Sequence, residues 1–142
     1  MSAKPETTFT KSVHDKLPLG RKDPYWMKNS NTYTSGIWDV WYSGTALDMW
    51  VEYKFIVVPK LGATIIKPEL SALQEKWGRE RMAEGRNMAV IVGCKDGGVI
   101  FENLEWESEI TAAAFKVRIQ SRAELARWII DRVQKPSRPK RK

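Results

Sequence analysis

The distribution of apolar and polar residues predicts a β-hairpin in the first half of the chain, formed by residues 36–44 and 48–56. The second strand is apolar on both faces, because Trp50, Val51 and Tyr53 occupy adjacent as well as alternating positions. Strands with this composition are typically central in a sheet and covered on both sides. We therefore expect residues 48–56 to form a buried central strand.

A first helix is predicted upstream of the hairpin. Phe9, Val13 and Leu17 recur every four residues, which is the spacing of one helix face. Pro18 is expected to end this helix, and residues 1–6 are expected to be a disordered lead.

Two further helices follow the hairpin. The second helix is predicted over residues 70–85 and ends at Gly85, a common helix terminator. Its expected buried stripe consists of Leu70, Leu73, Trp77 and Met82. A third helix opens at the capping box Ser121-Arg-Ala-Glu124 and runs to about Val133. Its apolar residues do not form one clean stripe, so the sequence does not predict its packing.

The order of elements predicts the fold class. Short strands are expected over 25–27, 63–66, 87–94 and 99–101, with a turn at 96–98, whereas the segment 106–117 is ambiguous. The order of helix, hairpin, helix, hairpin and helix indicates an α/β protein with a small mixed β-sheet flanked by helices. A helical crossover should place strand 87–94 parallel to strand 50–57.

The composition is typical of a soluble globular protein, since 42% of the 142 residues are hydrophobic and 29% are charged. The chain has no apolar run near about 18 residues and no apolar core of a signal peptide, so we expect an intracellular, cytoplasmic location. The single cysteine, Cys94, excludes an internal disulfide and a cysteine-based zinc site, and we expect it to be buried. The length suits one domain, expected over residues 1–134.

Positive charge is concentrated at the C-terminus. The net charge is +7, and residues 135–142 contribute five of these charges, which leaves +2 for the rest of the chain. Because this segment contains two prolines and no acidic residue, we expect it to be a basic disordered tail. Such a tail either improves solubility or binds nucleic-acid phosphates in a salt-dependent way.

The candidate chemistry lies on the predicted hairpin. Glu52 and Lys54 are two residues apart in one strand, so both project from the same face while Tyr53 faces away. If Asp39 lies across the hairpin, two carboxylates and an ammonium group converge in a manner that suits Mg²⁺ or Mn²⁺. Such a cation polarises a phosphoryl oxygen and generates hydroxide. The alternative is that Glu52 and Lys54 form a structural ion pair in the core.

These residues resemble the motifs of the PD-(D/E)XK nuclease superfamily. Together, Gly36-x-x-Asp39, Glu52-Tyr-Lys54 and Leu70-Ser-Ala-Leu-Gln74 resemble the virus-type replication-repair nuclease group (VRR-NUC). The layout is also similar to that of small phage Holliday-junction resolvases of the endonuclease I type. The resemblance covers about residues 8–103 and implies a restriction-endonuclease-like αβββαβ core.

The resemblance also implies roles for individual residues. Asp39 and Glu52 would bind Mg²⁺ (or Mn²⁺), with the main-chain carbonyl of Tyr53 as a further ligand. Lys54 would assist the attacking water. Gln74 would approach the lysine or the scissile phosphate; its alternative is a polar residue at a helix boundary.

The sequence departs from the superfamily pattern at two positions. Trp38 replaces the proline that usually precedes the first aspartate. The first helix of the superfamily often supplies a glutamate, whereas here we find His14 and Asp15. On a helical wheel with about 100° per residue, His14 lies beside the apolar face and Asp15 nearly opposite it. His14 is therefore predicted to contact a metal, a water or a phosphate; the alternative is a surface or half-buried helix histidine.

DNA is the partner that these features predict. The basic residues expected to contact its backbone are Lys28, Lys60, Lys67, Arg138, Lys140, Arg141 and Lys142. Tryptophan side chains can stack on bases, although we expect most of them to lie in the core.

The expected function is that of a phage structure-selective endonuclease that hydrolyses DNA phosphodiester bonds with Mg²⁺ or Mn²⁺. Symmetric cutting of a four-way junction requires two active sites at a fixed spacing, which a homodimer would supply. Two alternatives stay open: the same chemistry on flaps, nicks or linear DNA, and a non-catalytic nucleic-acid-binding module. No small-molecule cofactor and no membrane association are expected.

Overall fold

The predicted central strand lies in the middle of a mixed five-stranded sheet in the computed structural model, which describes residues 4–17, 25–29 and 36–134. The strand order is β1-β2-β3-β5-β6, with β1 at Tyr25–Lys28, β2 at Val40–Ser43, β3 at Asp48–Phe55, β5 at Asn87–Cys94 and β6 at Gly97–Phe101. β3 pairs antiparallel with β2 and parallel with β5. The predicted α/β class, the hairpin and the parallel crossover are therefore confirmed.

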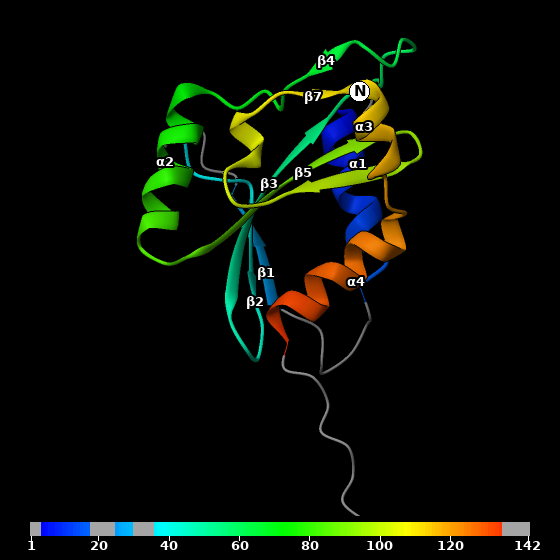
Figure 1. Ribbon diagram of the computed structural model, residues 1–142. Coiled ribbons are helices and arrows are strands. Elements are labelled where there is room, and N and C mark those ends of the chain that lie inside the picture. The colour runs from blue at the N-terminus through cyan, green and yellow to red at the C-terminus, as the bar shows by residue number, and fades with distance from the viewer. Residues whose placement is uncertain (1–3, 18–24, 30–35, 135–142) are drawn as a thin grey trace, which may run out of the picture.

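Helices cover both faces of this sheet (Figure 1). α1 (Pro5–His14) and α4 (Arg122–Val133) lie on one face and share a core with alternating residues of β3 and β5. α2 (Ala72–Ala83) and α3 (Ala112–Val117) lie over the opposite face, where a second core forms. Among the described residues, no helix has both the length and the apolar composition needed to cross a membrane.

A second, two-stranded sheet lies at one end of the molecule (Figure 1). β4 (Ile65–Ile66) pairs antiparallel with β7 (Ile110–Thr111), which agrees with the extended piece predicted over 63–66. The ambiguous segment 106–117 holds the end of the 3-10 helix η1 (Glu105–Glu107), followed by β7 and α3. These short elements form only when the chain folds back on itself, so no local periodicity announces them.

The first helix begins earlier than predicted. It spans Pro5–His14, so its first turn contains Glu6, and the prediction of a disordered lead is wrong at Pro5 and Glu6. Proline is well suited to a first helical turn, because its missing N–H would have no helical partner there. Phe9 and Val13 are buried as predicted, and Leu17 is buried just after the helix ends.

Two predicted helix faces are corrected. Leu73 of α2 is 53% exposed, whereas Gly78 is the buried residue of that helix. A helical wheel gives a direction, but burial also requires an element opposite that direction, and the core below α2 reaches Trp77 and not Leu73. In α4 a stripe does exist; it consists of Leu125, Ala126, Ile129 and Val133.

Candidate active site

Asp39 and Glu52 face each other across the β2–β3 hairpin. Val40 pairs with Val51 at the end of the ladder, so Asp39 and Glu52 are the next positions beyond it, and the charge of Asp39 acts on Glu52. Directly opposed residues of an antiparallel pair project to the same side of the sheet. The main-chain carbonyl of Asp39 accepts a hydrogen bond from the N–H of Asn29 at 2.7 Å, which holds this segment just outside β2. The strand register therefore brings both carboxylates to one face.

Glu52 is an almost fully buried carboxylate, with 4% exposure. Its Oε2 accepts a hydrogen bond from Gln74 Nε2 at 3.0 Å and lies 3.3 Å from Lys54 Nζ. Burial raises the pKa of Glu52 from 4.5 to about 7, although the Lys54 charge opposes this rise, and Asp39 adds to it. A buried carboxylate of this kind is stabilised in its charged form by a nearby cation.

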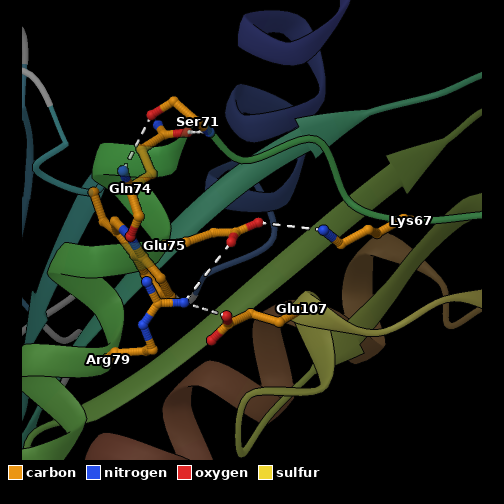
Figure 2. Close-up of polar contacts among 7 residues, drawn as sticks. Lys67, Ser71, Gln74, Glu75, Arg79 and Glu107 are labelled. Carbon is orange, nitrogen blue, oxygen red and sulfur yellow. Dashed lines mark hydrogen bonds and ion pairs between the residues drawn. The ribbon is translucent and has the colours of Figure 1, made fainter.

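Gln74 connects helix α2 to the candidate site. It belongs to a capping box in which its main-chain N–H donates to Ser71 Oγ at 3.1 Å, while its Oε1 accepts from the Ser71 N–H at 3.0 Å (Figure 2). The same Oε1 lies 3.4 Å from Lys54 Nζ, and Nε2 donates to Glu52. One amide group thus orients the acid and the lysine while it also stabilises the start of α2.

Asp39 is linked electrostatically to two lysines. Burial raises the pKa of Asp39, and the charges of Lys28 and Lys54 oppose this rise. Lys28 lies at the end of the exposed edge strand β1, opposite Val40 in the register. Of the cations predicted to contact DNA, Lys28 therefore lies near the carboxylates.

His14 does not join the carboxylates, contrary to its predicted contact with a metal, a water or a phosphate. Its Nε2 is 2.7 Å from the hydroxyl of Tyr42, which in turn hydrogen-bonds the hydroxyl of Tyr53 at 2.5 Å. Both tyrosines belong to the core below α1 and α4, on the face opposite Glu52. His14 also stacks on the half-exposed Trp26, with ring centroids 4.0 Å apart.

The protonation state of His14 follows from this environment. Burial, together with the Lys28 charge, lowers the pKa of His14 from 6.5 to about 4, although the Asp15 charge opposes this shift. The imidazole is therefore neutral at physiological pH. Its role is to complete a buried polar network, because unpaired hydroxyl groups of the two tyrosines would be costly there.

Glu6 is the acidic residue on α1 that the sequence reading missed. It is half-buried and lies seven residues before Val13, a spacing of about two helical turns that places both on one face. Burial raises the pKa of Glu6, while Lys54 lowers it and Asp39 raises it. Glu6 therefore lies within electrostatic reach of the candidate site. The wheel would have identified it if the helix had been predicted to begin at Pro5.

The donor set around this site fits a hard divalent cation. Among the described residues, no three Asp, Glu, His or Cys side chains gather closely enough to form a complete metal site. Asp39 and Glu52 are nevertheless oxygen donors whose pKa values are raised by burial, and a cation would offset the cost of ionising them. Further ligands would be oxygen atoms of main-chain carbonyls, water or phosphate.

Lys60 and Lys67, also predicted to contact DNA, are both exposed. Lys67 lines an open groove of about 790 Å³, which is also lined by Ser71, the N-cap residue of the capping box with Gln74. Its Nζ lies 3.4 Å from a carboxylate oxygen of Glu75 (Figure 2). The remaining predicted contacts, Arg138, Lys140, Arg141 and Lys142, lie with the tail outside the described residues.

The sequence matches no family profile, and no curated protein matches it significantly. Among solved structures, the chain is similar to Hjc, a Holliday junction resolvase from the archaeal hyperthermophile Archaeoglobus fulgidus, with a TM-score of 0.54. The match covers 84% of this chain and 98% of Hjc, at 13% sequence identity. The two proteins therefore share a fold, consistent with the restriction-endonuclease-like class, although their sequences have little in common.

Proposed function

We propose that this protein is a metal-dependent nuclease that hydrolyses phosphodiester bonds in branched DNA. The observation that carries the proposal is the cluster around Glu52, a buried carboxylate that lies opposite Asp39 and contacts both Lys54 and Gln74. The fold supports the proposal, because a solved structure with this fold is that of a Holliday junction resolvase. Fold alone does not assign function, so the residues of the site carry the argument.

In the proposed mechanism, Asp39 and Glu52 would hold Mg²⁺ or Mn²⁺ together with the main-chain carbonyl of Tyr53. When bound, the cation would polarise the phosphoryl group and lower the pKa of water. Lys54 orients the attacking water and stabilises negative charge that develops on the phosphate. Gln74 maintains this arrangement, since its amide contacts Glu52 through nitrogen and Lys54 through oxygen.

We extend the proposal to four-way junctions cut by a homodimer. Paired incisions across a junction require two active sites at a fixed spacing, and a two-fold dimer supplies that spacing. Lys28, Lys60 and Lys67 are the described cations that would contact the DNA backbone in each subunit. A phage origin belongs to the same proposal and rests on the resemblance to small phage resolvases.

A panel of DNA substrates with related sequences tests the proposal. A four-way junction, a flap, a nicked duplex and a linear duplex are each incubated with Mg²⁺, Mn²⁺, Ca²⁺ or excess EDTA. We expect cleavage with Mg²⁺ and Mn²⁺ but not with Ca²⁺ or EDTA, because Ca²⁺ is larger and holds its ligands in looser geometry. The junction should be cut fastest. Glu52→Gln is the matched control, since it keeps the side-chain shape, removes the charge and should bind DNA without cutting it.

The outcomes of this panel separate the alternatives. Faster cleavage of flaps, nicks or linear duplex would keep the chemistry and reject the junction as substrate. DNA binding without cleavage in any metal would favour a non-catalytic module in which Glu52 and Lys54, 3.3 Å apart, form a structural ion pair. Robust cleavage in EDTA would refute the metal mechanism.

A further inference from the structure

The residue before Asp39 is held by an unusual set of contacts. Trp38 is fully buried, and its indole Nε1 donates a hydrogen bond to the main-chain carbonyl of Gln74 at 2.9 Å. Its ring lies edge-on to Trp106, with centroids 5.1 Å apart. A tryptophan does not restrict the backbone as a proline would, so these side-chain contacts add to the main-chain hydrogen bonds that hold Asp39.

Helix α2 is shaped to accept the Trp38 ring. Gly78 lies four residues after Gln74, on the same face of the helix. A Cβ atom at Gly78 would lie 2.5 Å from Cζ2 of Trp38, closer than real Cβ contacts allow. The absence of a side chain at Gly78 therefore lets the indole approach the helix backbone closely enough to reach the Gln74 carbonyl.

Gln74 connects this contact to the other carboxylate. Its carbonyl receives the Trp38 indole, while its side-chain amide holds Glu52 and lies near Lys54. The segment that carries Asp39 and the strand that carries Glu52 are therefore joined in two ways, through the β2–β3 ladder and through one residue of α2. The segment that carries Asp39 also contacts α2 at a second place, since the Gly36 backbone lies against α2 at Leu73.

We propose that Trp38 is a positioning residue which, by docking on Gly78 and Gln74, sets the place of Asp39 relative to Glu52 for binding a divalent cation. The inference rests on the proposed function only in that it takes these two carboxylates as the metal ligands. It does not require that DNA be cleaved. Groups that hold metal ligands in place commonly change metal affinity by roughly 10–100-fold when they are lost.

Trp38→Phe is the test variant, and Trp106→Phe is its matched control. Both tryptophans are fully buried and pack against each other, so both substitutions remove a similar volume from one core. They differ in their hydrogen bonds, because Trp106 Nε1 has no partner among the described residues. Binding of Mn²⁺ to the DNA-free protein is measured by electron paramagnetic resonance, and stability is measured by urea unfolding.

We expect Trp38→Phe to weaken Mn²⁺ binding by roughly tenfold or more, while Trp106→Phe stays within about twofold of wild type at a similar loss of stability. Equal Mn²⁺ affinities in the two variants would overturn the proposal. The proposal would also be overturned if the Asp39→Asn variant bound Mn²⁺ as tightly as the wild-type protein does. Should Mn²⁺ binding follow the expected order while no DNA in the panel is cut, the nuclease proposal fails and the positioning role stands.

Gly78→Ala tests the same contact from the side of the helix, alone if Trp38→Phe does not fold and in both backgrounds if it does. The added methyl group must displace the indole or the helix, so Mn²⁺ binding should weaken although alanine favours the helix. Phenylalanine at position 38 has no atom where Cζ2 of Trp38 lies. In the Trp38→Phe background, the methyl group added by Gly78→Ala should therefore cause a smaller further loss of Mn²⁺ affinity. Equal losses in both backgrounds would show that the two sites are independent and would contradict the proposed docking.

Discussion

The raised pKa of Glu52 makes a quantitative prediction about the metal-free protein. The pKa rises from 4.5 to about 7 on folding, mainly through burial. A tenfold change in proton affinity corresponds to about 1.4 kcal/mol, so ionised Glu52 destabilises the fold by about 3 kcal/mol relative to its protonated form. The side chain is 5% exposed, so solvent screening reduces this cost little.

The direction of the pH dependence follows from proton binding in the two states. Below pH 4.5 the folded and unfolded chains both hold the Glu52 proton. Between 4.5 and about 7 the folded protein keeps a proton that the unfolded chain has released, so stability falls as pH rises. Above about 7 both states are ionised and the loss is complete.

Glu52→Gln isolates this effect, because it keeps the shape and removes the titration. Urea unfolding of both proteins, followed by tryptophan fluorescence in EDTA, is measured from about pH 4.5 to 8. We expect wild type to lose about 3 kcal/mol relative to the variant across this range. The pKa of His14 in the folded protein is lowered to about 4, so its contribution to stability is lost as the pH falls. This loss is the same in both proteins and cancels in the comparison.

Adding Mg²⁺ at pH 8 should raise the stability of the wild-type protein and not that of the Glu52→Gln variant. A cation that binds the folded state shifts the folding equilibrium toward that state. Parallel pH profiles, within about 0.5 kcal/mol, would refute the assignment of Glu52 as a carboxylate destabilised by burial.

Three further predictions concern other parts of the chain. Asp39→Ala and Lys54→Ala should each abolish cleavage while DNA binding, measured by gel shift, stays near wild type; near-normal turnover in either would remove that residue from the site. Glu6→Gln should slow single-turnover cleavage by about tenfold or more, whereas His14→Ala should retain the wild-type rate at every pH between 5 and 8 and lose about 1–3 kcal/mol of stability; the opposite ranking would restore the histidine to the site. Deleting residues 135–142 should weaken DNA binding and reduce the slope of log affinity against log salt by up to about 0.9 per lost phosphate contact, and an unchanged slope would exclude the tail as a DNA contact.

Much of the fold was predictable because its signals are local. The apolar composition of residues 48–56 identified the central strand, and the two-residue spacing of Glu52 and Lys54 set both side chains on one face. The capping box at Ser121 marked the start of α4. Each of these features depends on neighbours within a few residues, which a single sequence displays in full.

The candidate site was predictable only in part. The sequence placed Asp39 on the hairpin, but the register of Val40 with Val51 was needed to set it opposite Glu52. The sequence pointed to His14 and not to Glu6, because the first helix was predicted to begin after Glu6, whereas α1 begins at Pro5 and His14 contacts Tyr42. A wheel supplies the direction of a side chain and not the element that lies in that direction.

The sequence by itself determined the α/β class, the hairpin and the pairing of an acid with a lysine on one strand face. The tertiary structure decided that Gln74 contacts both groups, that Trp38 docks on Gly78, and that His14 belongs to a tyrosine network on the far face. These contacts join segments between 20 and 40 residues apart in the chain. They arise from the packing of whole helices on a sheet, and no periodicity in the chain encodes such packing.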